Sequence, residues 1–357
     1  MKTYILFIIK KFLISFLYIS SIMISLIFII NLLSEIDFFN RYKVEYYLPI
    51  YMSLLNSPSL FFEILPFVIL ISTQLFFISL LKNNELQVFK YSGLKNSKII
   101  TLISSIALAL GLFFILFFYN FSSNFKMLYL EIKSNYSVDG KYLAVVTKNG
   151  LWIKDKVNNS NIIINANRFE NNFLIDTFIT EFNQNFEAIR NIKSEKINMI
   201  EKNWIIFNPT IFEKNSKYNL DSMYLKTNFD YKTIQSLFSN LSSLSLFKLF
   251  ELKKNYLKLN YSTTEVNVQI QKIISYPIYL AMMTLFSAIL MFNTRYMKSF
   301  VIKVSLGFLA SVIIYYINNF FNVLGTTEKI SYAMSVWFPI ILLFFINSIM
   351  LIKINEK

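Results

Sequence analysis

Residues 12–33 read FLISFLYISSIMISLIFIINLL and contain no charged side chain. A bilayer whose hydrocarbon core is about 30 Å thick is crossed by roughly 20 apolar residues in a helix, so this stretch is long enough to span a membrane. Five more charge-free stretches of similar length follow, at 64–81, 99–121, 273–294, 304–327 and 330–352. The sequence therefore predicts six transmembrane helices, three before and three after a long intervening segment.

The composition of the whole chain favours lipid as its main solvent. Of the 357 residues, 55% are hydrophobic and only 16% are charged, whereas soluble domains usually carry about 25% charged residues. The chain contains no His and no Cys, which excludes the usual zinc ligands, nucleophiles activated by His, and disulfides. Any chemistry in this chain would therefore rest on carboxylates or Lys, or belong to a partner, and we expect no metal site and no cofactor here.

The distribution of Lys and Arg predicts the orientation of the helices. Short loops with an excess of these residues face the cytoplasm. Such an excess is found before residue 12, at 82–98 and at 295–303, whereas 34–63 has two cations against four acids. Both termini are thus expected in the cytoplasm and the segment 122–272 outside. About +10 of the formal net charge of +14 falls on cytoplasmic segments, so the charge signals orientation and does not indicate a nucleic-acid partner.

The intervening segment 122–272 consists of short β-rich runs separated by Asn, Lys and Gly, which is typical of a folded β domain. The tripeptide Lys148-Asn149-Gly150 predicts a hairpin turn between strands at 143–147 and 151–155, because Asn and Gly tolerate positive φ. Further strands are expected at 162–166, 173–182, 186–192, 195–200 and 204–207. Their spacing of about ten residues favours an antiparallel sandwich or roll.

Two finer patterns occur in this segment. Alternation within 173–182 places Leu174, Phe178 and Phe182 on one face of a strand. Residues 245–258 have apolar side chains at helical spacing behind Ser245, a predicted N-cap, with lysines near the far end. We expect this amphipathic helix to pack on the outer domain or to lie near the membrane surface.

The loop between the second and third predicted spans is the most informative short segment. Residues 84–94 read NELQVFKYSGL. Asn84 is a predicted cap for a short helix at about 84–93 with Glu85 in its first turn, and Gly93 suits the left-handed position that follows a helix. The helix has more apolar and aromatic surface than a solvated connector needs, which predicts docking onto a cytosolic partner or onto the bilayer. The residues concerned are Leu86, Val88, Phe89 and Tyr91.

The sequence contains no site that could couple transport to an energy source. Its six Gly form no phosphate-binding motif of the type GxxxxGK[ST]. An ion-coupled transporter normally has an ionisable residue within its bundle, and the six charge-free stretches have none. Their polar residues include Gln74, Asn318 and Asn322, which either line a polar path or hydrogen-bond between helices.

Several of these features occur in a characteristic order. They are the three-plus-three helices around a β-rich insert, the loop running from Glu85-Leu86 to Ser92-Gly93-Leu94, and the hexapeptide Gly150-Leu151-Trp152-Ile153-Lys154-Asp155. Together they resemble the LptF/LptG permeases, the inner-membrane subunits of the lipopolysaccharide-export ABC transporter. The hexapeptide and Asn203-Trp204 look more like the LptG member. Prolines 66, 277 and 339 also fall where the family tends to have Pro.

The resemblance implies a non-catalytic permease subunit that extracts lipopolysaccharide from the inner membrane of a Gram-negative bacterium. The implied fold is six transmembrane helices with an inserted periplasmic antiparallel β-jellyroll-like domain, divided at 1–121, 122–272 and 273–357. The implied partners are an LptB-like ATPase dimer that uses ATP and Mg, a paralogous LptF-like permease, and an LptC/LptA-like periplasmic bridge.

The resemblance also implies roles for particular residues. The loop helix would be the coupling helix that docks on the ATPase, through Glu85, Leu86, Phe89, Tyr91 and Gly93. The first and fifth helices would form the gate and the cavity wall. The lipid path would include Asn31, Arg41, Lys43, Trp152, Asn318 and Asn322. Basic residues near the outer end of the first helix are associated with lipid A phosphates in the family, but here this region has Glu35 and Asp37, so we do not expect phosphate contacts at the usual place.

Three alternatives stay open at this point. The chain could be the paralogous LptF subunit, which has the same fold and task. It could be a secondary transporter, although this requires an ionisable intramembrane residue that the stretches lack. It could also be a membrane-anchored periplasmic scaffold whose helices only anchor and oligomerise.

Overall fold

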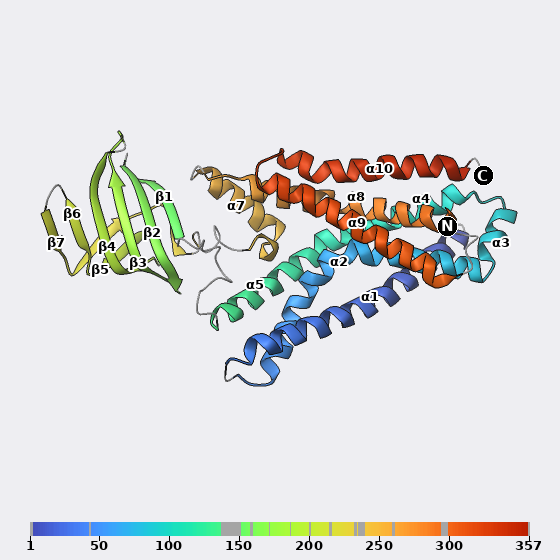
Figure 1. Cartoon of the computed structure of the whole chain (residues 1–357), viewed down its shortest axis with the longest axis horizontal. Coiled ribbons are helices and arrows are strands. Elements are labelled where there is room, and N and C mark those ends of the chain that lie inside the picture. Colours follow the sequence, from blue (N-terminus) through green and yellow to red (C-terminus); the bar gives the residue numbers. More distant parts are fainter. Residues whose placement is uncertain are drawn as a thin grey trace. The chain divides into compact units, whose positions relative to one another are not determined.

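The computed structural model (Figure 1) describes residues 3–42, 44–136, 151–157, 160–170, 172–185, 187–199, 201–213, 216–231, 234, 240–258, 261–293 and 299–355. The chain divides into a helical unit, Met1–Lys126 with Thr264–Lys357, and a sheet unit, Met127–Thr263. The sequence-based limits of the insert, 122 and 272, lie within helices that begin or end several residues away, because the charge-free criterion marks only the apolar part of each helix.

Among the described residues, six helices are long and apolar enough to cross a membrane, as the six charge-free stretches predict. The third span is a continuous helix that contains a π-helical segment, η1. The elements are α1 (Thr3–Phe39), α2 (Tyr47–Lys82), α4 (Asn96–Phe113) with η1 (Phe114–Tyr119) and α5 (Asn120–Ser134), α8 (Thr264–Asn293), α9 (Phe300–Thr326) and α10 (Tyr332–Asn355).

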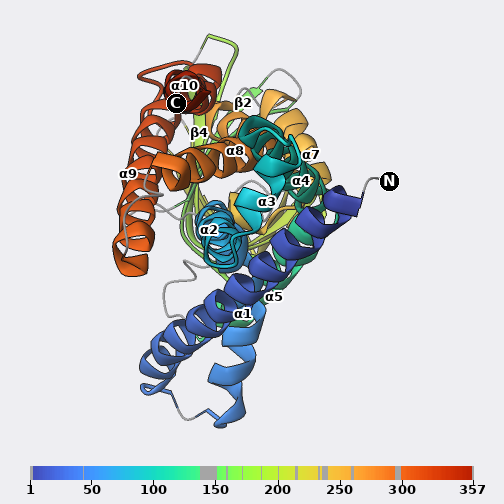
Figure 2. The same cartoon turned by 90° about the vertical axis from the view of Figure 1, so that its right-hand side faces the viewer.

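The helical unit is built around α2 and α8, which pack against each other and against most of the other spans (Figure 2). In each of these two helices, 61% of the most apolar window is buried. In α1 and α9 the buried share is only 17%, although their hydropathy is just as suited to a membrane. Helices α1 and α9 therefore present apolar surface outward, where lipid or another membrane chain would cover it.

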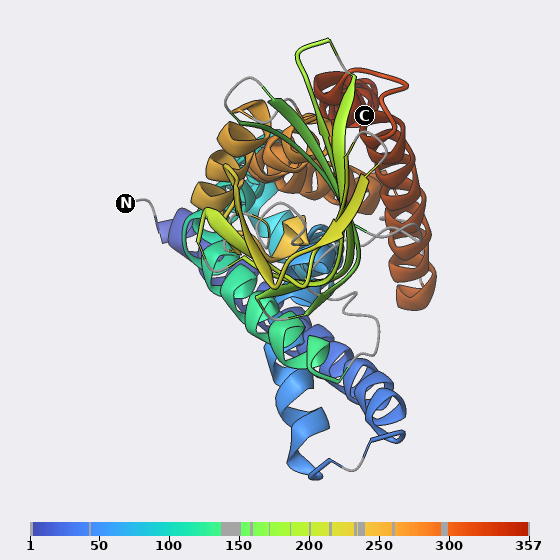
Figure 3. The same cartoon turned by 90° about the vertical axis from the view of Figure 1, so that its left-hand side faces the viewer.

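The sheet unit contains one antiparallel sheet that is strongly curved (Figure 3). Its main path runs β1-β2-β3-β4-β5-β8, while β6 pairs with β4 and β7 pairs with β6. The strands are β1 (Leu151–Val157), β2 (Ser160–Glu170), β3 (Phe173–Phe182), β4 (Ala188–Asn198), β5 (Asn203–Phe207), β6 (Thr210–Glu213), β7 (Ser216–Asn219) and β8 (Ser222–Lys226). An inserted antiparallel sheet between the third and fourth spans is thus confirmed.

Side-chain hydrogen bonds hold the curved sheet to the segment that follows β8. The Asp155 carboxylate in β1 accepts from the backbone N–H and the side-chain amide of Asn228, at 2.9 and 2.8 Å. The Trp204 indole N–H in β5 donates to the Phe229 carbonyl at 2.9 Å. Trp204 and Phe229 are both fully buried, so the inside of the sheet unit is filled by its own side chains in this structure.

Two predictions about strands are wrong for identifiable reasons. The predicted strands 186–192 and 195–200 form the single strand β4. Its polar centre stays extended because the Ser194 hydroxyl donates to the carbonyl of Phe207 at 2.6 Å. In β3, Asp176 has φ 53°, which interrupts the alternation. Leu174 is therefore buried, whereas Phe178 is exposed on the opposite face.

Other predictions have mixed outcomes. The hairpin turn at 148–150 and the strand at 143–147 lie outside the described residues. The short strands β6, β7 and β8 are not predicted; they are four or five residues long, and β7 has no buried position. The amphipathic helix is confirmed as α7 (Leu246–Lys258), which follows a 3-10 turn, η2 (Leu241–Ser243). Ser245 caps it by accepting from the Lys248 N–H at 3.4 Å.

Candidate functional site

The loop predicted to carry the partner contact forms a short helix, α3 (Glu85–Tyr91), between α2 and α4. Its N-terminus differs from the prediction. Asn84 adopts the left-handed conformation, with φ 57°, and its side chain makes no capping hydrogen bond. The tight link from α2 leaves only Asn83 and Asn84 between the two helices, so the chain must reverse at Asn84, and this excludes the extended backbone of a usual N-cap.

The C-terminus of α3 follows the prediction. Gly93 has φ 76°, a conformation that residues with a Cβ rarely adopt. The Leu94 N–H donates to the Phe89 carbonyl and the Gly93 N–H to the Lys90 carbonyl, both at 2.9 Å. These two bonds form a Schellman motif, which ends the helix and turns the chain toward α4.

The apolar residues of α3 divide into an inner and an outer pair. Leu86 is buried in a cluster formed with α1, α2 and α4, and Phe89 packs against the same cluster. The Phe89 ring also contacts Phe7 of α1 edge-on, with 6.0 Å between ring centroids. Val88 and Tyr91 are exposed, Tyr91 to 87%. The inner pair thus fixes α3 to the helical unit, and the outer pair is available to a further molecule.

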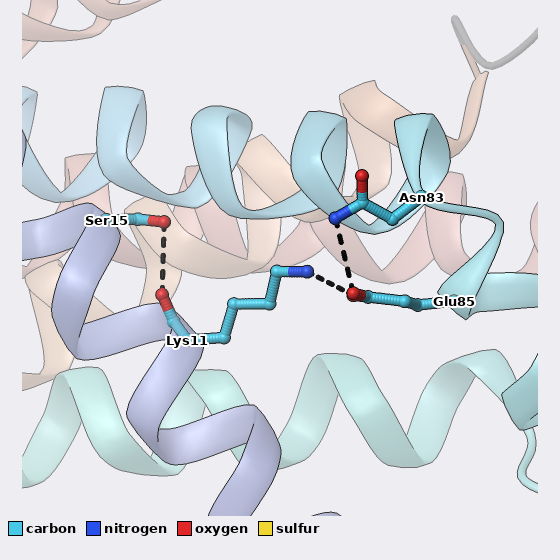
Figure 4. A network of polar contacts seen from close by, with 4 residues as sticks. All are labelled: Lys11, Ser15, Asn83 and Glu85. Carbon is cyan, nitrogen blue, oxygen red and sulfur yellow. Dashed lines mark hydrogen bonds and ion pairs between the residues drawn. The ribbon is translucent and has the colours of Figure 1, made fainter.

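Glu85, the residue expected to contact a partner, makes an ion pair with Lys11 of α1 (Figure 4). The Asn83 side-chain amide also donates to the Glu85 carboxylate at 3.3 Å. The Lys11 and Glu85 side chains are only 17% and 26% exposed, so this pair is less screened by water than a surface ion pair. Lys11 also lies over the ring of Phe7 in the same helix, at 5.4 Å from its centroid, and this ring in turn contacts Phe89 of α3.

Lys11 is the functional candidate that sequence reasoning missed. In the sequence it counts only toward the orientation of the first helix. Its pairing with a residue 74 positions away has no local signal, because it depends on how α1 crosses the α2–α3 corner. Beside α3, a recess of about 420 Å³ is lined by Gly93, Leu94, Lys95, Ser97, Lys98 and Thr101.

The residues predicted for the lipid path lie in different places. Asn31 is buried and ties α1 to α2, donating to the Ser53 carbonyl at 3.2 Å and accepting from the Asn56 amide at 3.0 Å. Arg41 is exposed in the turn after α1, and Lys43 lies outside the described residues. Trp152 is 55% exposed on β1.

The two asparagines of α9 differ from each other. Asn318 hydrogen-bonds the side chain of Tyr279 in α8, as expected for a contact between helices. Asn322 is buried, and its side-chain oxygen has no hydrogen-bond partner among the described residues. Within the helical unit, Asn31 and Asn318 thus each contact a neighbouring helix, α2 and α8 respectively.

A polar contact between α2 and α9 is a further feature of the helical unit. The buried Gln74 side chain donates to the Lys303 carbonyl at 3.0 Å. A Cβ on Gly307 would lie 2.0 Å from the Gln74 amide nitrogen, so Gly at this position leaves room for the end of the Gln74 side chain between the two helices. Gln74 thus serves as a contact between helices.

The fold defines a multi-pass membrane protein with three helices on either side of an inserted antiparallel sheet, and a short helix after the second span. Comparison with protein families adds a match over residues 6–353 to the model described as lipopolysaccharide export system permease LptF/LptG. The match covers nearly the whole chain, so the chain belongs to the LptF/LptG family. No curated protein matches the chain significantly.

Proposed function

We propose that this chain is the LptG-like permease subunit of a lipopolysaccharide exporter whose energy comes from ATP hydrolysed, with Mg, in a partner subunit. The proposal places it in the inner membrane of a Gram-negative bacterium, with both termini in the cytoplasm and the sheet unit in the periplasm. The excess of Lys and Arg on the short loops supports this orientation. Resemblance of residues 150–155 and of Asn203-Trp204 supports LptG over LptF.

The observation that carries the proposal is how α3 packs against the helical unit. Leu86 and Phe89 hold the helix to α1, α2 and α4, while Val88 and Tyr91 point away from that core and are exposed. An exposed aromatic side chain on a firmly held helix suits a protein contact. We assign this face to the LptB-like ATPase dimer, and the recess beside Gly93 to a side chain of that partner.

The link between Lys11 and Glu85 suggests how such docking would reach the lipid. When the ATPase moves α3, the ion pair and the contact between Phe7 and Phe89 would move the adjoining end of α1 with it. Helix α1 has a largely unburied apolar surface, as a gate toward the lipid requires. The lipid would then pass to the sheet unit and on to an LptC/LptA-like bridge.

Reconstitution tests the proposal. The chain is purified with a candidate LptB-like ATPase and a paired LptF-like permease, and ATP hydrolysis and lipopolysaccharide release are measured in proteoliposomes. We expect Tyr91→Ala to weaken assembly with the ATPase and to lower both activities. Tyr46→Ala is the matched control, because Tyr46 is also an exposed aromatic residue but lies between α1 and α2. No stable complex, or equal activities for the two variants, would refute the assignment.

A further inference from the structure

Helix α7 has two apolar stripes, one buried and one exposed. Leu249 and Leu252 are fully buried. Phe247, Phe250 and Leu257 are exposed, Phe247 to 82%. At 100° per residue, the exposed three lie on a different side of the helix from the buried pair. The second stripe, formed by these three side chains, is therefore an exposed apolar surface of α7, which Lys254 interrupts.

The residues after α7 connect the helix to β1. Tyr256 contacts Tyr261, with 5.8 Å between ring centroids. The Tyr261 hydroxyl accepts the backbone N–H of Lys154 in β1 at 3.1 Å, and burial raises the pKa of this phenol. These contacts do not involve the three side chains of the second stripe, which stay exposed.

Charge distinguishes the second stripe from an ordinary protein contact. Helix α7 contains four lysines and one glutamate, whereas interface cores are depleted in Lys. Lys254 lies on the helix surface between Phe250 and Leu257, and Lys253 lies at the border of the stripe. Long lysine side chains beside apolar residues are typical of helices at a membrane surface, where the ammonium groups reach the anionic headgroups.

The length of the chain also limits how far α7 can lie from the bilayer. Helix α7 ends at Lys258, and the span α8 begins at Thr264. Six residue steps extend at most roughly 20 Å. The charge-free part of α8 begins at residue 273, a further nine residues or roughly 14 Å of helix. The covalent structure thus keeps α7 within roughly 35 Å of this part of the span, which leaves the bilayer surface within its reach.

We propose that Phe247, Phe250 and Leu257 insert at shallow depth into the membrane leaflet on the side of the sheet unit, with Lys253 and Lys254 contacting anionic phospholipid headgroups. This inference rests on the proposed topology, in which the sheet unit stays on one side of the membrane that the six helices cross. Its consequence is that α7 anchors the sheet unit to the surface from which lipopolysaccharide is taken.

The test uses the full chain alone in lipid nanodiscs, so it does not depend on transport activity. Because the chain has no Cys, Phe247→Cys and Leu257→Cys each carry a single fluorescent label that is sensitive to polarity. Quenching by lipids spin-labelled near the headgroup is compared between neutral discs and discs containing anionic phospholipid. Tyr224→Cys, exposed on β8, is the matched control.

We expect several-fold stronger lipid quenching at positions 247 and 257 than at 224, and stronger quenching in anionic than in neutral discs. Lys253→Gln with Lys254→Gln should reduce the difference between the two kinds of disc, since each Lys near an anionic surface changes partitioning by roughly fivefold. Labels at 247 and 257 that are as accessible to water as the one at 224 would overturn the proposal. So would labels shielded from water but not quenched by lipid, which would indicate a protein cover, or quenching that is independent of anionic lipid.

The two proposals can fail separately. If the exporter does not assemble or release lipopolysaccharide while the labels are quenched as expected, only the proposed function fails. If the labels are not quenched while the reconstituted exporter is active, only the membrane contact of α7 fails.

Discussion

At the scale of single residues, the ion pair between Lys11 and Glu85 can be distinguished from a direct contact of Glu85 with an ATPase by charge reversal. Lys11→Glu or Glu85→Lys alone places two like charges together, and we expect lower coupled ATP hydrolysis in both variants. The double variant restores an ion pair of opposite polarity between α1 and α3. If the pair transmits movement, the double variant regains activity measured in the reconstituted complex.

A control measures whether loss of the ion pair lowers the stability of the chain. An ion pair with this exposure contributes about 0.5–1 kcal/mol, so thermal unfolding of Glu85→Gln should change little. If the double reversal is no more active than Glu85→Lys alone, Glu85 acts on the partner directly and the proposed link through Lys11 is wrong.

The two tryptophans of the sheet, Trp152 and Trp204, are expected to differ in their effects on stability. Trp204 is fully buried, and its indole N–H donates to the Phe229 carbonyl. Trp204→Phe removes this bond and leaves a cavity, which costs about 1–3 kcal/mol. Hydrogen exchange by mass spectrometry should show faster exchange in β5 and β8. Trp152→Phe, at an exposed position on the same sheet, should change exchange very little, and equal effects would contradict this account.

At the scale of elements, the close contact between α2 and α9 gives a prediction for Gly307. Gly307→Ala forces the buried Gln74 side chain to move, because the new Cβ would overlap its amide group. Crowding of this kind costs about 1–3 kcal/mol, so we expect a lower thermal unfolding temperature in detergent. Gln74→Ala in the same chain should recover part of the loss. Ser305→Ala on the exposed side of α9 is the control and should have no effect.

Elements were predictable from sequence where one property decides the structure. The six spans follow from apolar length alone, because the bilayer sets the length that a helix needs. The sheet was less predictable from the sequence, because the ends of each strand depend on its contacts with neighbouring strands. Ser194 lies within β4, where it pairs with Thr177 of β3 and its hydroxyl donates to the Phe207 carbonyl, and Asp176 shifts the faces of β3 through its own backbone angle. Neither contact has a local sequence signal.

In the candidate site, too, the sequence predicts features set by local requirements and misses those that depend on how the helices pack. Gly93 was predictable because its positive φ is a local requirement of the helix end. The roles of Leu86 and Lys11 were not, because both depend on the crossing of α1 over α3. The sequence of a short amphipathic helix shows which side chains are apolar, but only the structure shows which of them are buried against the rest of the protein.

At the scale of the whole molecule, the proposed orientation makes a prediction that the lack of Cys renders easy to test. Ser92→Cys introduces one exposed thiol after α3, and Tyr224→Cys introduces one on the sheet unit. We expect a membrane-impermeant maleimide to label position 224, but not 92, in intact spheroplasts. In inside-out membrane vesicles the labelling should reverse, and detergent should expose both positions.

Labelling of both positions from one side would contradict the proposed topology, because an odd number of spans separates the loop after α2 from the insert after the third span. Reversed labelling would mean that the Lys-rich loops face outward, and α3 could then not meet a cytoplasmic ATPase.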